Sequence, residues 1–441
     1  MRAKIYILSV ILLVFSFTAS AQGDLSMVVG DTPQRNYLNP AFMPRTTYLV
    51  IPFIGGIEIG AESSIGYGDI LKDHYIDGQQ LVKKTKKNNP LALKANLDFI
   101  SFGVRFRESN MITFSNRIRV AGGIDYPSDI FRFIFDNPVV SSDIFNIKLN
   151  SSVMAWNETA VGYTRQIGRY WSVGVKVKYI AGVAALNTNA TSFKIDKTVS
   201  DYTIQGDVDI MSGNYNMETS EFGTSSIMKN PGVAFDFGGV YASDQGWKVS
   251  LAVTDLGFIK WNAENSSRII SRDLSKKYVF KGLGDLNDVF GSASLGDMLD
   301  SVYHDMMDAI EVDTLTGTGF TTMMPATLHA GGEYDIRGDN IHNVSLNFLG
   351  TFAYKQRFNY SITAGYRYTL PNGRFSAMGA LTHKRTDPLA LGLGVMANTR
   401  GFQFYAATNF SVLALPGCLR NMRSFSLNLG MSVFLGKGRL R

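Results

Sequence analysis

Histidine and cysteine, the residue types best suited to catalysis and metal binding, are scarce in this chain, which has five and one of them respectively. The histidines show no paired metal-binding spacing; they are His74, His304, His329, His342 and His383. Cys418 has no second cysteine with which to form a disulfide. A Ser-x-x-Lys match at 226–229 lacks its companion motifs. We therefore predict no catalytic residue, no metal site and no cofactor, and we interpret the chain as a non-enzyme.

One exception deserves a hypothesis of its own. His329 alternates onto the same strand face as Thr327, Glu333 and Asp335. A hydrolase could in principle use such a histidine, but no serine is specified as its partner. We rank this hypothesis third, below the two given at the end of this subsection.

Charged side chains recur at every second position of several long segments and therefore share one strand face. Both signs are present, which suits a hydrated interior or one that holds a folded segment. The candidate polar residues lining this interior are Arg117, Arg119, Lys176, Asp236, His329, Glu333 and Arg367.

The elements that would position these residues are strands with one apolar face. From Phe425 to Leu435 every odd residue is apolar, and from Trp171 to Tyr179 the odd residues are again apolar or aromatic. A soluble sandwich has the same period of two, with its apolar face inward. The runs here last about ten to fourteen residues, whereas strands of globular proteins average about five or six. A strand that crosses a bilayer at a tilt needs roughly nine to eleven residues. We therefore favour a transmembrane barrel, with its apolar face toward lipid.

Short and long connections alternate along the chain, as they do in outer-membrane barrels with short periplasmic turns and longer extracellular loops. Long connections are expected near 61–96, 123–149, 185–231 and 261–324. The prediction is an all-β antiparallel barrel of about fourteen strands, wider than the eight strands whose interior side chains can fill. The strands are expected near 47–60, 97–107, 110–122, 150–165, 170–184, 232–242, 247–260, 325–336, 341–354, 358–369, 374–382, 388–397, 402–413 and 424–435. Trp247 and Trp261 bound one strand at odd positions and are predicted to share its outer face, as part of an aromatic girdle.

The N-terminus reads as a secretory signal peptide, residues 1–21. Arg2 and Lys4 precede an apolar run from Ile5 to Phe17, and small residues end at Ala21, where we predict cleavage. Residues 22–46 are polar, contain three prolines and show no strand period, so they are expected to form a periplasmic segment or a plug. The barrel then occupies 47–441. This organisation places the protein in a bacterial outer membrane.

Composition agrees with that class. Mean hydropathy is +0.01, with 43 glycines, 12% aromatic residues and a formal net charge of +6. The charge is too small to argue for nucleic acid. Membrane lipid and lipopolysaccharide are the expected partners, and the exposed basic run at 83–87 is a candidate contact for lipopolysaccharide phosphates.

Two long connections are predicted to carry amphipathic helices on the extracellular side. Residues 295–310 show helical apolar spacing, which suggests a lid on the barrel mouth more than a partner-binding helix. A shorter apolar cluster, Ile130 to Phe135, could form a second helix at the mouth or in the outer leaflet.

Asn39-Pro40-Ala41 is similar to the N-terminal Asn-Pro-Ala of barrels of the long-chain fatty-acid transporter type. Strand-like segments at 232–241, 249–258 and 401–409 also resemble an uncharacterised branch of outer-membrane barrels from bacteria with type IX secretion. The resemblance implies a fourteen-stranded barrel, and relatives include hydrophobic-substrate channels and a secretion-shuttle barrel. One departure is the C-terminus, where Phe434 is followed by a basic tail instead of ending the chain.

Two leading functions follow. The first is a channel or transporter for small amphipathic or hydrophobic molecules. The alternative is a structural or accessory subunit of an outer-membrane secretion or assembly complex, which would add other outer-membrane or secretion proteins as partners.

Overall fold

The computed structural model describes most of the chain outside the N-terminus and some connections. The described residues are 25, 27–66, 71–72, 75–76, 78–135, 142–188, 191–198, 201–217, 221–223, 229–271, 276–280, 309, 311–353, 358–399, 401–412 and 422–435. The predicted signal peptide, residues 22–24, Cys418 and nearly all of the predicted helix at 295–310 lie outside this set. The predictions made for them stay predictions.

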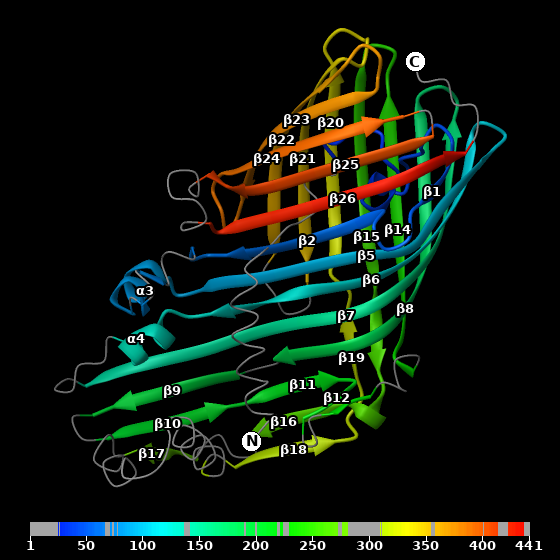
Figure 1. Ribbon diagram of the computed structural model, residues 1–441. Helices are drawn as coiled ribbons and strands as arrows, with labels where there is room; N and C mark the ends of the chain where they lie inside the picture. The colour runs from blue at the N-terminus through cyan, green and yellow to red at the C-terminus, as the bar shows by residue number, and fades with distance from the viewer. Residues whose placement is uncertain are drawn as a thin grey trace.

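Fourteen antiparallel strands form a closed barrel (Figure 1), which confirms the predicted fold class. β1 and β2 together make one strand of the wall, and β1 closes the ring by pairing with β26 from Thr47↔Leu435 to Val50↔Ser432. In wall order the strands are β1 (Thr47–Val50) with β2 (Gly56–Ser63), β5 (Asn89–Phe106), β6 (Asn110–Tyr126), β7 (Asp143–Ile167), β8 (Trp171–Thr188), β14 (Pro231–Ala242), β15 (Trp247–Trp261), β20 (Ala326–Asp335), β21 (His342–Phe352), β22 (Asn359–Thr369), β23 (Phe375–Lys384), β24 (Ala390–Asn398), β25 (Phe402–Ser411) and β26 (Ser424–Leu435).

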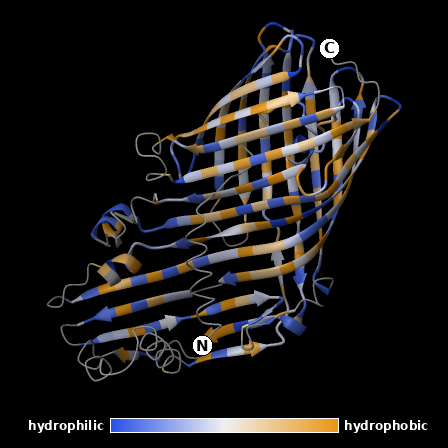
Figure 2. Cartoon of the chain, viewed as in Figure 1, coloured by the Kyte–Doolittle hydropathy of each residue, from blue (hydrophilic) through white to orange (hydrophobic). Residues whose placement is uncertain are grey.

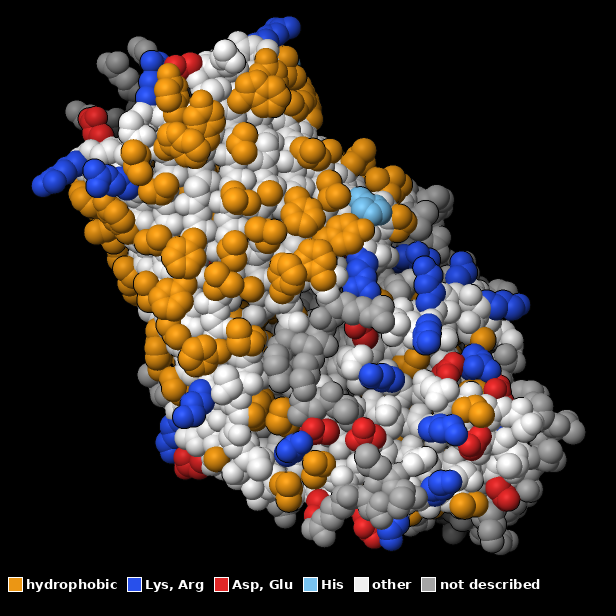
Figure 3. Space-filling view, turned by 180° about the vertical axis from the view of Figure 1, so that it is seen from behind, with side chains coloured by type: hydrophobic (Ala, Val, Ile, Leu, Met, Phe, Trp, Pro, Cys, Tyr) orange, Lys and Arg blue, Asp and Glu red, His pale blue; other side chains and the backbone are white. Residues whose placement is uncertain are grey.

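The wall turns its apolar face outward and its polar face inward, the reverse of a soluble protein. On β8, Val177 is 53% exposed while its neighbours Lys176 and Lys178 are 4% and 3% exposed. The alternation is visible along the strands in Figure 2, and Figure 3 shows hydrophobic side chains covering the barrel exterior while charged side chains collect beyond it. The predicted faces of 171–179 and 425–435 are both confirmed.

The short links join strands at one end of the barrel, here called the short-turn end, as predicted. The opposite long-loop end is larger than predicted, because the connections themselves form strands. β7 alone has 25 residues, roughly 80 Å at about 3.3 Å per residue. The additional strands are β3 (Leu71–Lys72), β4 (Tyr75–Ile76), β9 (Thr191–Lys197), β10 (Tyr202–Asp207), β11 (Asp209–Gly213), β12 (Tyr215–Asn216), β13 (Glu221–Phe222), β16 (Ser267–Ser271), β17 (Tyr278–Phe280), β18 (Val312–Thr316) and β19 (Phe320–Met323).

Most of these strands extend the wall sheet past the barrel. β9 pairs with the first residues of β7, Asp143 to Leu149, and β10 pairs with β9. β11 pairs with β8 and with β16, and β16 pairs with β18. Phe145, Ile195 and Ile204 form a buried apolar cluster in this extension, which explains why these segments fold as strands.

Helices are few and short among the described residues: η1 (Pro33–Tyr37), α3 (Gly78–Lys84), α4 (Asp129–Phe135) and η3 (Ala263–Asn265). α4 confirms the predicted helix at 130–135 and packs with α3 near the long-loop end (Figure 1). No helix in the described ranges combines the length and hydropathy that crossing a bilayer would require.

The prediction that Trp247 and Trp261 share an outer face is wrong. Trp247 is 52% exposed, but Trp261 is 1% exposed and donates from Nε1 to Thr322 Oγ1 at 2.9 Å. A β-bulge lies between the two tryptophans, where Asp236 of β14 faces both Thr254 and Asp255 of β15. One extra residue reverses the inside–outside phase of everything after it.

The seam between the first and last wall strands is weakly paired. β2 pairs with β26 at Gly56↔Gly430, and the Ser63 N–H at the other end of β2 donates to Arg423 O at 2.8 Å, whereas β2 pairs continuously with β5 from Ile57 to Ser63. The chain turns out of the wall between β1 and β2, and Phe53, at a φ of 65°, is exposed there. Between these two points, residues 57–62 of β2 therefore lack the continuous ladder that joins the other wall strands.

Candidate functional site

The seven predicted lumen residues all lie on inward faces of the wall. Arg117 and Arg119 come from β6, Lys176 from β8 and Asp236 from β14. His329 and Glu333 lie on β20, and Arg367, half-buried, lies on β22. All except Arg367 are buried. The structure divides them between a charge cluster and a set that contacts the N-terminal segment.

The charge cluster centres on a carboxylate that the sequence analysis did not identify. Asp255 occupies the bulge of β15 at a φ of 62°, and its N–H donates to Asp236 Oδ1 at 2.8 Å. Strict alternation from Trp247 would place Asp255 on the lipid-facing side. The bulge brings it inside instead, and the only sequence signal is the adjacent polar pair Thr254-Asp255 in an otherwise alternating strand.

Two cations hold this carboxylate. Arg119 donates from Nη1 to both Asp255 oxygens at 2.9 and 3.0 Å and to Glu158 Oε2 at 2.7 Å. Lys178 Nζ lies 2.6 Å from Asp255 Oδ1 and 2.8 Å from Asp236 Oδ2. All five groups are buried. Because each charge has an opposite partner in contact, the low-dielectric interior can hold them.

Glu158 and Asp98 were also missed. Glu158 lies on the even, inward face of β7, so alternation alone could have found it. Asp98 could not be found this way, because a second bulge follows it on β5 and shifts the register between Asp98 and Ile100. Its Oδ1 accepts from Arg117 Nε at 2.8 Å.

The N-terminal segment 27–46, together with Leu25, lies inside the ring of strands near the short-turn end (Figure 1, dark blue) and is called the plug below. Leu25, Val28 and Val29 pack against inward side chains of β23, β24 and β25. Gln34 donates from Nε2 to Gly55 O at 2.7 Å and to Ser432 Oγ at 3.3 Å, so that it bridges the two strands that close the barrel.

The Asn-Pro-Ala motif of the plug contacts β7, β8, β14 and β15. Asn39 donates from Nδ2 to Gly239 O and Leu251 O at 3.2 and 3.3 Å. Pro40 O accepts from Thr164 Oγ1 at 2.6 Å, and Ala41 O accepts from Ser172 Oγ at 2.8 Å.

Glycine allows this close approach. A Cβ atom at Gly174 would lie 2.2 Å from Pro40 O, and one at Gly238 would lie 2.0 Å from Asn39 Oδ1. These distances are far inside van der Waals contact. The glycines of β8 and β14 therefore leave the space that the Asn-Pro-Ala motif occupies.

Ionic and aromatic contacts hold η1. Arg35 is buried and pairs with Glu333, and Lys176 Nζ donates to Asn36 O at 2.7 Å. The guanidinium of Arg117 stacks over the Tyr37 ring at 3.7 Å, while the Tyr37 hydroxyl donates to Asp98 Oδ2 at 2.7 Å. Burial, followed by the Asp98 carboxylate, raises the pKa of Tyr37 well above its ordinary value, so the phenol stays protonated and keeps donating.

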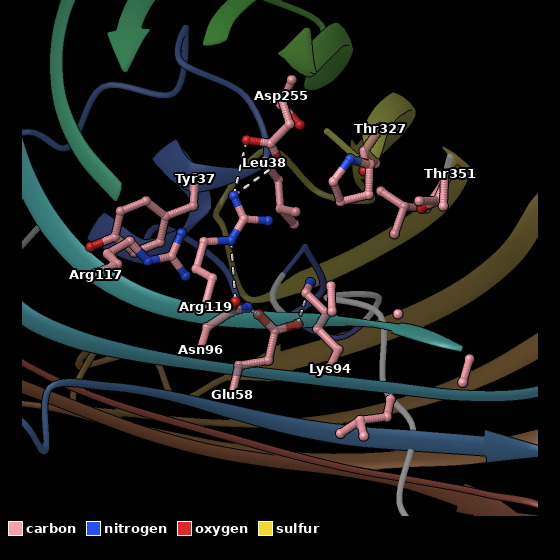
Figure 4. Close-up of a pocket in the computed structure, with 18 of the residues that line it drawn as sticks. Tyr37, Leu38, Glu58, Lys94, Asn96, Arg117, Arg119, Asp255, Thr327 and Thr351 are labelled. Carbon is pink, nitrogen blue, oxygen red and sulfur yellow. Dashed lines mark hydrogen bonds and ion pairs between the residues drawn. The ribbon is translucent and has the colours of Figure 1, made fainter. Parts of the chain in front are cut away.

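Between the plug and the long-loop end lies a cavity of about 150 Å³. Figure 4 shows Tyr37 and Leu38 of the plug on one side and Thr327 and Thr351 on another. Charged and polar lining residues include Glu58, Lys94, Asn96, Asp98, Arg117, Arg119 and Asp255, and apolar ones include Leu38, Ile57, Leu93, Met154 and Leu349. The cavity is therefore amphipathic.

Residues 40–409 match DUF5723, a family of unknown function. The chain belongs to the DUF5723 family. No curated protein matches it in sequence.

Solved structures of outer-membrane barrels resemble this DUF5723 chain in fold at low identity. The toluene transporter TbuX of Ralstonia pickettii is 10% identical, with 94% of this chain and 98% of that chain covered and a TM-score of 0.44. The toluene transporter TodX of Pseudomonas putida is 8% identical, with 95% and 98% covered and a TM-score of 0.41. A FadL homologue of Pseudomonas aeruginosa is 11% identical, with 94% and 96% covered and a TM-score of 0.39. The likeness concerns the fold, and the suggested relation to secretion-shuttle barrels stays a prediction.

The lumen of this DUF5723 barrel holds a cavity lined by charged, polar and apolar side chains. Within the described ranges, no group of three or more histidine, cysteine or acidic residues could hold a metal ion. His329 is buried, and among the described residues neither of its ring nitrogens hydrogen-bonds to a serine or to a carboxylate. A general base needs a proton donor within hydrogen-bond reach, so the hydrolase hypothesis gains no support from this geometry.

Proposed function

We propose that this protein is a non-enzymatic channel or transporter of a bacterial outer membrane, which takes small amphipathic molecules into the cavity above its plug. The short-turn end would face the periplasm and the long-loop end the exterior. Export would follow cleavage of the signal peptide after Ala21. The exposed lysines 83, 84, 86 and 87 would meet lipopolysaccharide phosphates at the outer surface.

The cavity is the observation that carries the proposal. It combines hydrogen-bonding groups with apolar side chains inside a wall whose outer face is hydrophobic. Such a site can bind a molecule that has both a polar and an apolar part. Movement through the barrel also requires the plug to shift, because the plug borders the cavity on the short-turn side.

The test is uptake of small radiolabelled solutes into proteoliposomes. Thr327→Trp would fill the cavity and should lower uptake several-fold, since Thr327 lines it. The matched control is Leu328→Trp, in which the next residue of β20 changes on the opposite face of the strand. Uptake by the unmodified protein that equals that of empty liposomes would overturn the proposal.

The alternative, an accessory subunit of a secretion or assembly complex, is favoured by one observation. The extension built on β7, β9, β10, β11, β16 and β18 presents a sheet beyond the barrel that a channel does not need. Purification from native membranes with mild crosslinking would then recover defined outer-membrane partners. Recovery of the monomer alone would count against this alternative.

A further inference from the structure

The cavity lining has unused hydrogen-bond donors but no unused carboxylate acceptor. Four carboxylates line it, and every one of their oxygens already has a partner in the described chain. Glu58 is held by Lys94 and Asn96, and Asp98 by Arg117 and Tyr37. Asp255 and Glu62 are the other two. Their partners are Arg119, Lys178, Lys384, Asn359 and Thr386.

The two lining arginines are used only in part. Arg119 commits Nε to Asn96 at 3.3 Å and Nη1 to the carboxylates, and its Nη2 hydrogen-bonds to no described residue. Arg117 commits Nε to Asp98, and neither of its terminal nitrogens hydrogen-bonds within the described chain. Both arginines line the cavity, so these nitrogens can donate to a ligand bound there. Figure 4 shows Arg119 Nη2 directed away from both Asp255 and Asn96.

The side chains of Arg117 and Arg119 lie next to each other and are held in fixed positions. They stand two residues apart on β6, so they project from the same face of one strand. Arg117 is clamped by Asp98 and the Tyr37 ring, and Arg119 by two carboxylates and an amide. A planar guanidinium held in this way keeps its free edge available for a carboxylate, which it can bind with two parallel bonds.

The charge balance permits an added anion. Four cations and four carboxylates meet around the arginines, so the surroundings are neutral overall. They are Arg117, Arg119, Lys176 and Lys178 with Asp98, Glu158, Asp236 and Asp255. The cavity should therefore prefer a ligand with hydrogen-bond acceptors because its arginines have free donors, and not because the site carries a net positive charge.

We propose that the cavity is a binding site for a small carboxylate, whose anionic group is bound by the free edges of Arg117 and Arg119. The rest of the ligand would contact Leu38, Met154 and Leu349. A cavity of this volume accommodates a molecule about the size of benzene, so the ligand class is a carboxylate about as large as benzoate. This inference rests on the proposed function, because it names the ligand class of the same cavity.

The test is equilibrium binding to the purified full-length protein in detergent. Benzoate, neutral benzyl alcohol and cationic benzylamine have nearly the same shape and differ in charge. We expect benzoate to bind tighter than benzyl alcohol by on the order of ten- to one-hundred-fold, as charge-assisted bonds require. Equal binding of benzoate and benzyl alcohol, tighter binding of benzylamine, or no binding of benzoate would each overturn the inference.

A conservative variant separates recognition from folding. The double variant Arg117→Lys/Arg119→Lys keeps both charges but removes the planar edges, and it should abolish most of the preference for benzoate. Arg105→Lys is the matched control, because Arg105 lies on the neighbouring strand and binds the backbone oxygens of Arg45 and Glu108 instead. If uptake of neutral solutes occurs without any benzoate preference, this inference fails while the proposed function stands. Benzoate preference without any uptake would reject the transport proposal alone.

Discussion

Replacing one wall glycine should release the Asn-Pro-Ala motif from the barrel. In Gly174→Ala the new Cβ atom would lie 2.2 Å from Pro40 O and 2.6 Å from Ala41 N. Both are backbone atoms, so the clash can be relieved only by moving the plug by about 1 Å. That movement breaks the bonds from Thr164 and Ser172, which are 2.6 and 2.8 Å long.

The magnitude follows from these contacts. Two buried hydrogen bonds contribute about 1 kcal/mol each, and overpacking costs about 1–3 kcal/mol. The free energy of plug docking should therefore fall by about 3–5 kcal/mol. Hydrogen exchange reports such local opening, so the amides of Ala41 and Phe42 should exchange faster by roughly two to three and a half orders of magnitude. Those amides are protected by Asn39 in the docked state.

The matched control is Gly239→Ala. A Cβ atom at Gly239 meets no atom within 4 Å, although this residue neighbours Gly238 in the same belt of the wall. This variant should leave exchange at Ala41 and Phe42 unchanged. The reasoning would be refuted if Gly174→Ala also left it unchanged, or if both variants accelerated it equally. Proteoliposome uptake measured in parallel would show whether release of the plug opens a path.

Three further predictions concern the wall and the plug. Brominated lipids should quench the fluorescence of Trp247 but not that of Trp261, because only the Trp247 side chain is on the outer face. The variants Trp247→Phe and Trp261→Phe assign the emission of each residue, and equal quenching of both would contradict the bulge. Arg35→Met should lower the free energy of unfolding by about 3 kcal/mol, since it leaves the buried Glu333 without its nearest cation, and adding Glu333→Gln should restore part of it in urea titrations; no restoration would argue against the ion pair. Amides in 57–62 that point toward β26 should exchange faster than those bonded to β5, and uniform exchange across the strand would contradict the weak seam.

Much of the barrel could be predicted because the side chains of its strands alternate regularly between apolar and polar. A wall strand with lipid outside and polar groups inside repeats every two residues, so 171–179 and 425–435 reveal both the strand and its faces. The positions of the turns could also be predicted, because the alternation of apolar and polar residues stops at each short link. The inward position of Lys176 and Asp236 follows from the same period.

The parts that escaped prediction depend on departures from that period. One extra residue at Asp255 and another after Asp98 shift the register, and a single sequence gives no count of residues on the partner strand. Trp261 was assigned to the wrong face for this reason. The strands at the long-loop end escaped because segments such as Thr191–Lys197 are short, and their pairing depends on apolar neighbours far away in sequence.

Gln34 gives the plug a role in the order of assembly. Its bond to Ser432 joins residues 398 positions apart, so it can form only after the last wall strand exists. The same amide group holds Gly55, beside the strand that begins the wall. A nascent chain that lacks β26 therefore cannot form this bond, although the strands that contact the Asn-Pro-Ala motif are already present. The Gln34 side chain thereby makes the closure of the barrel depend on residues from both ends of the chain.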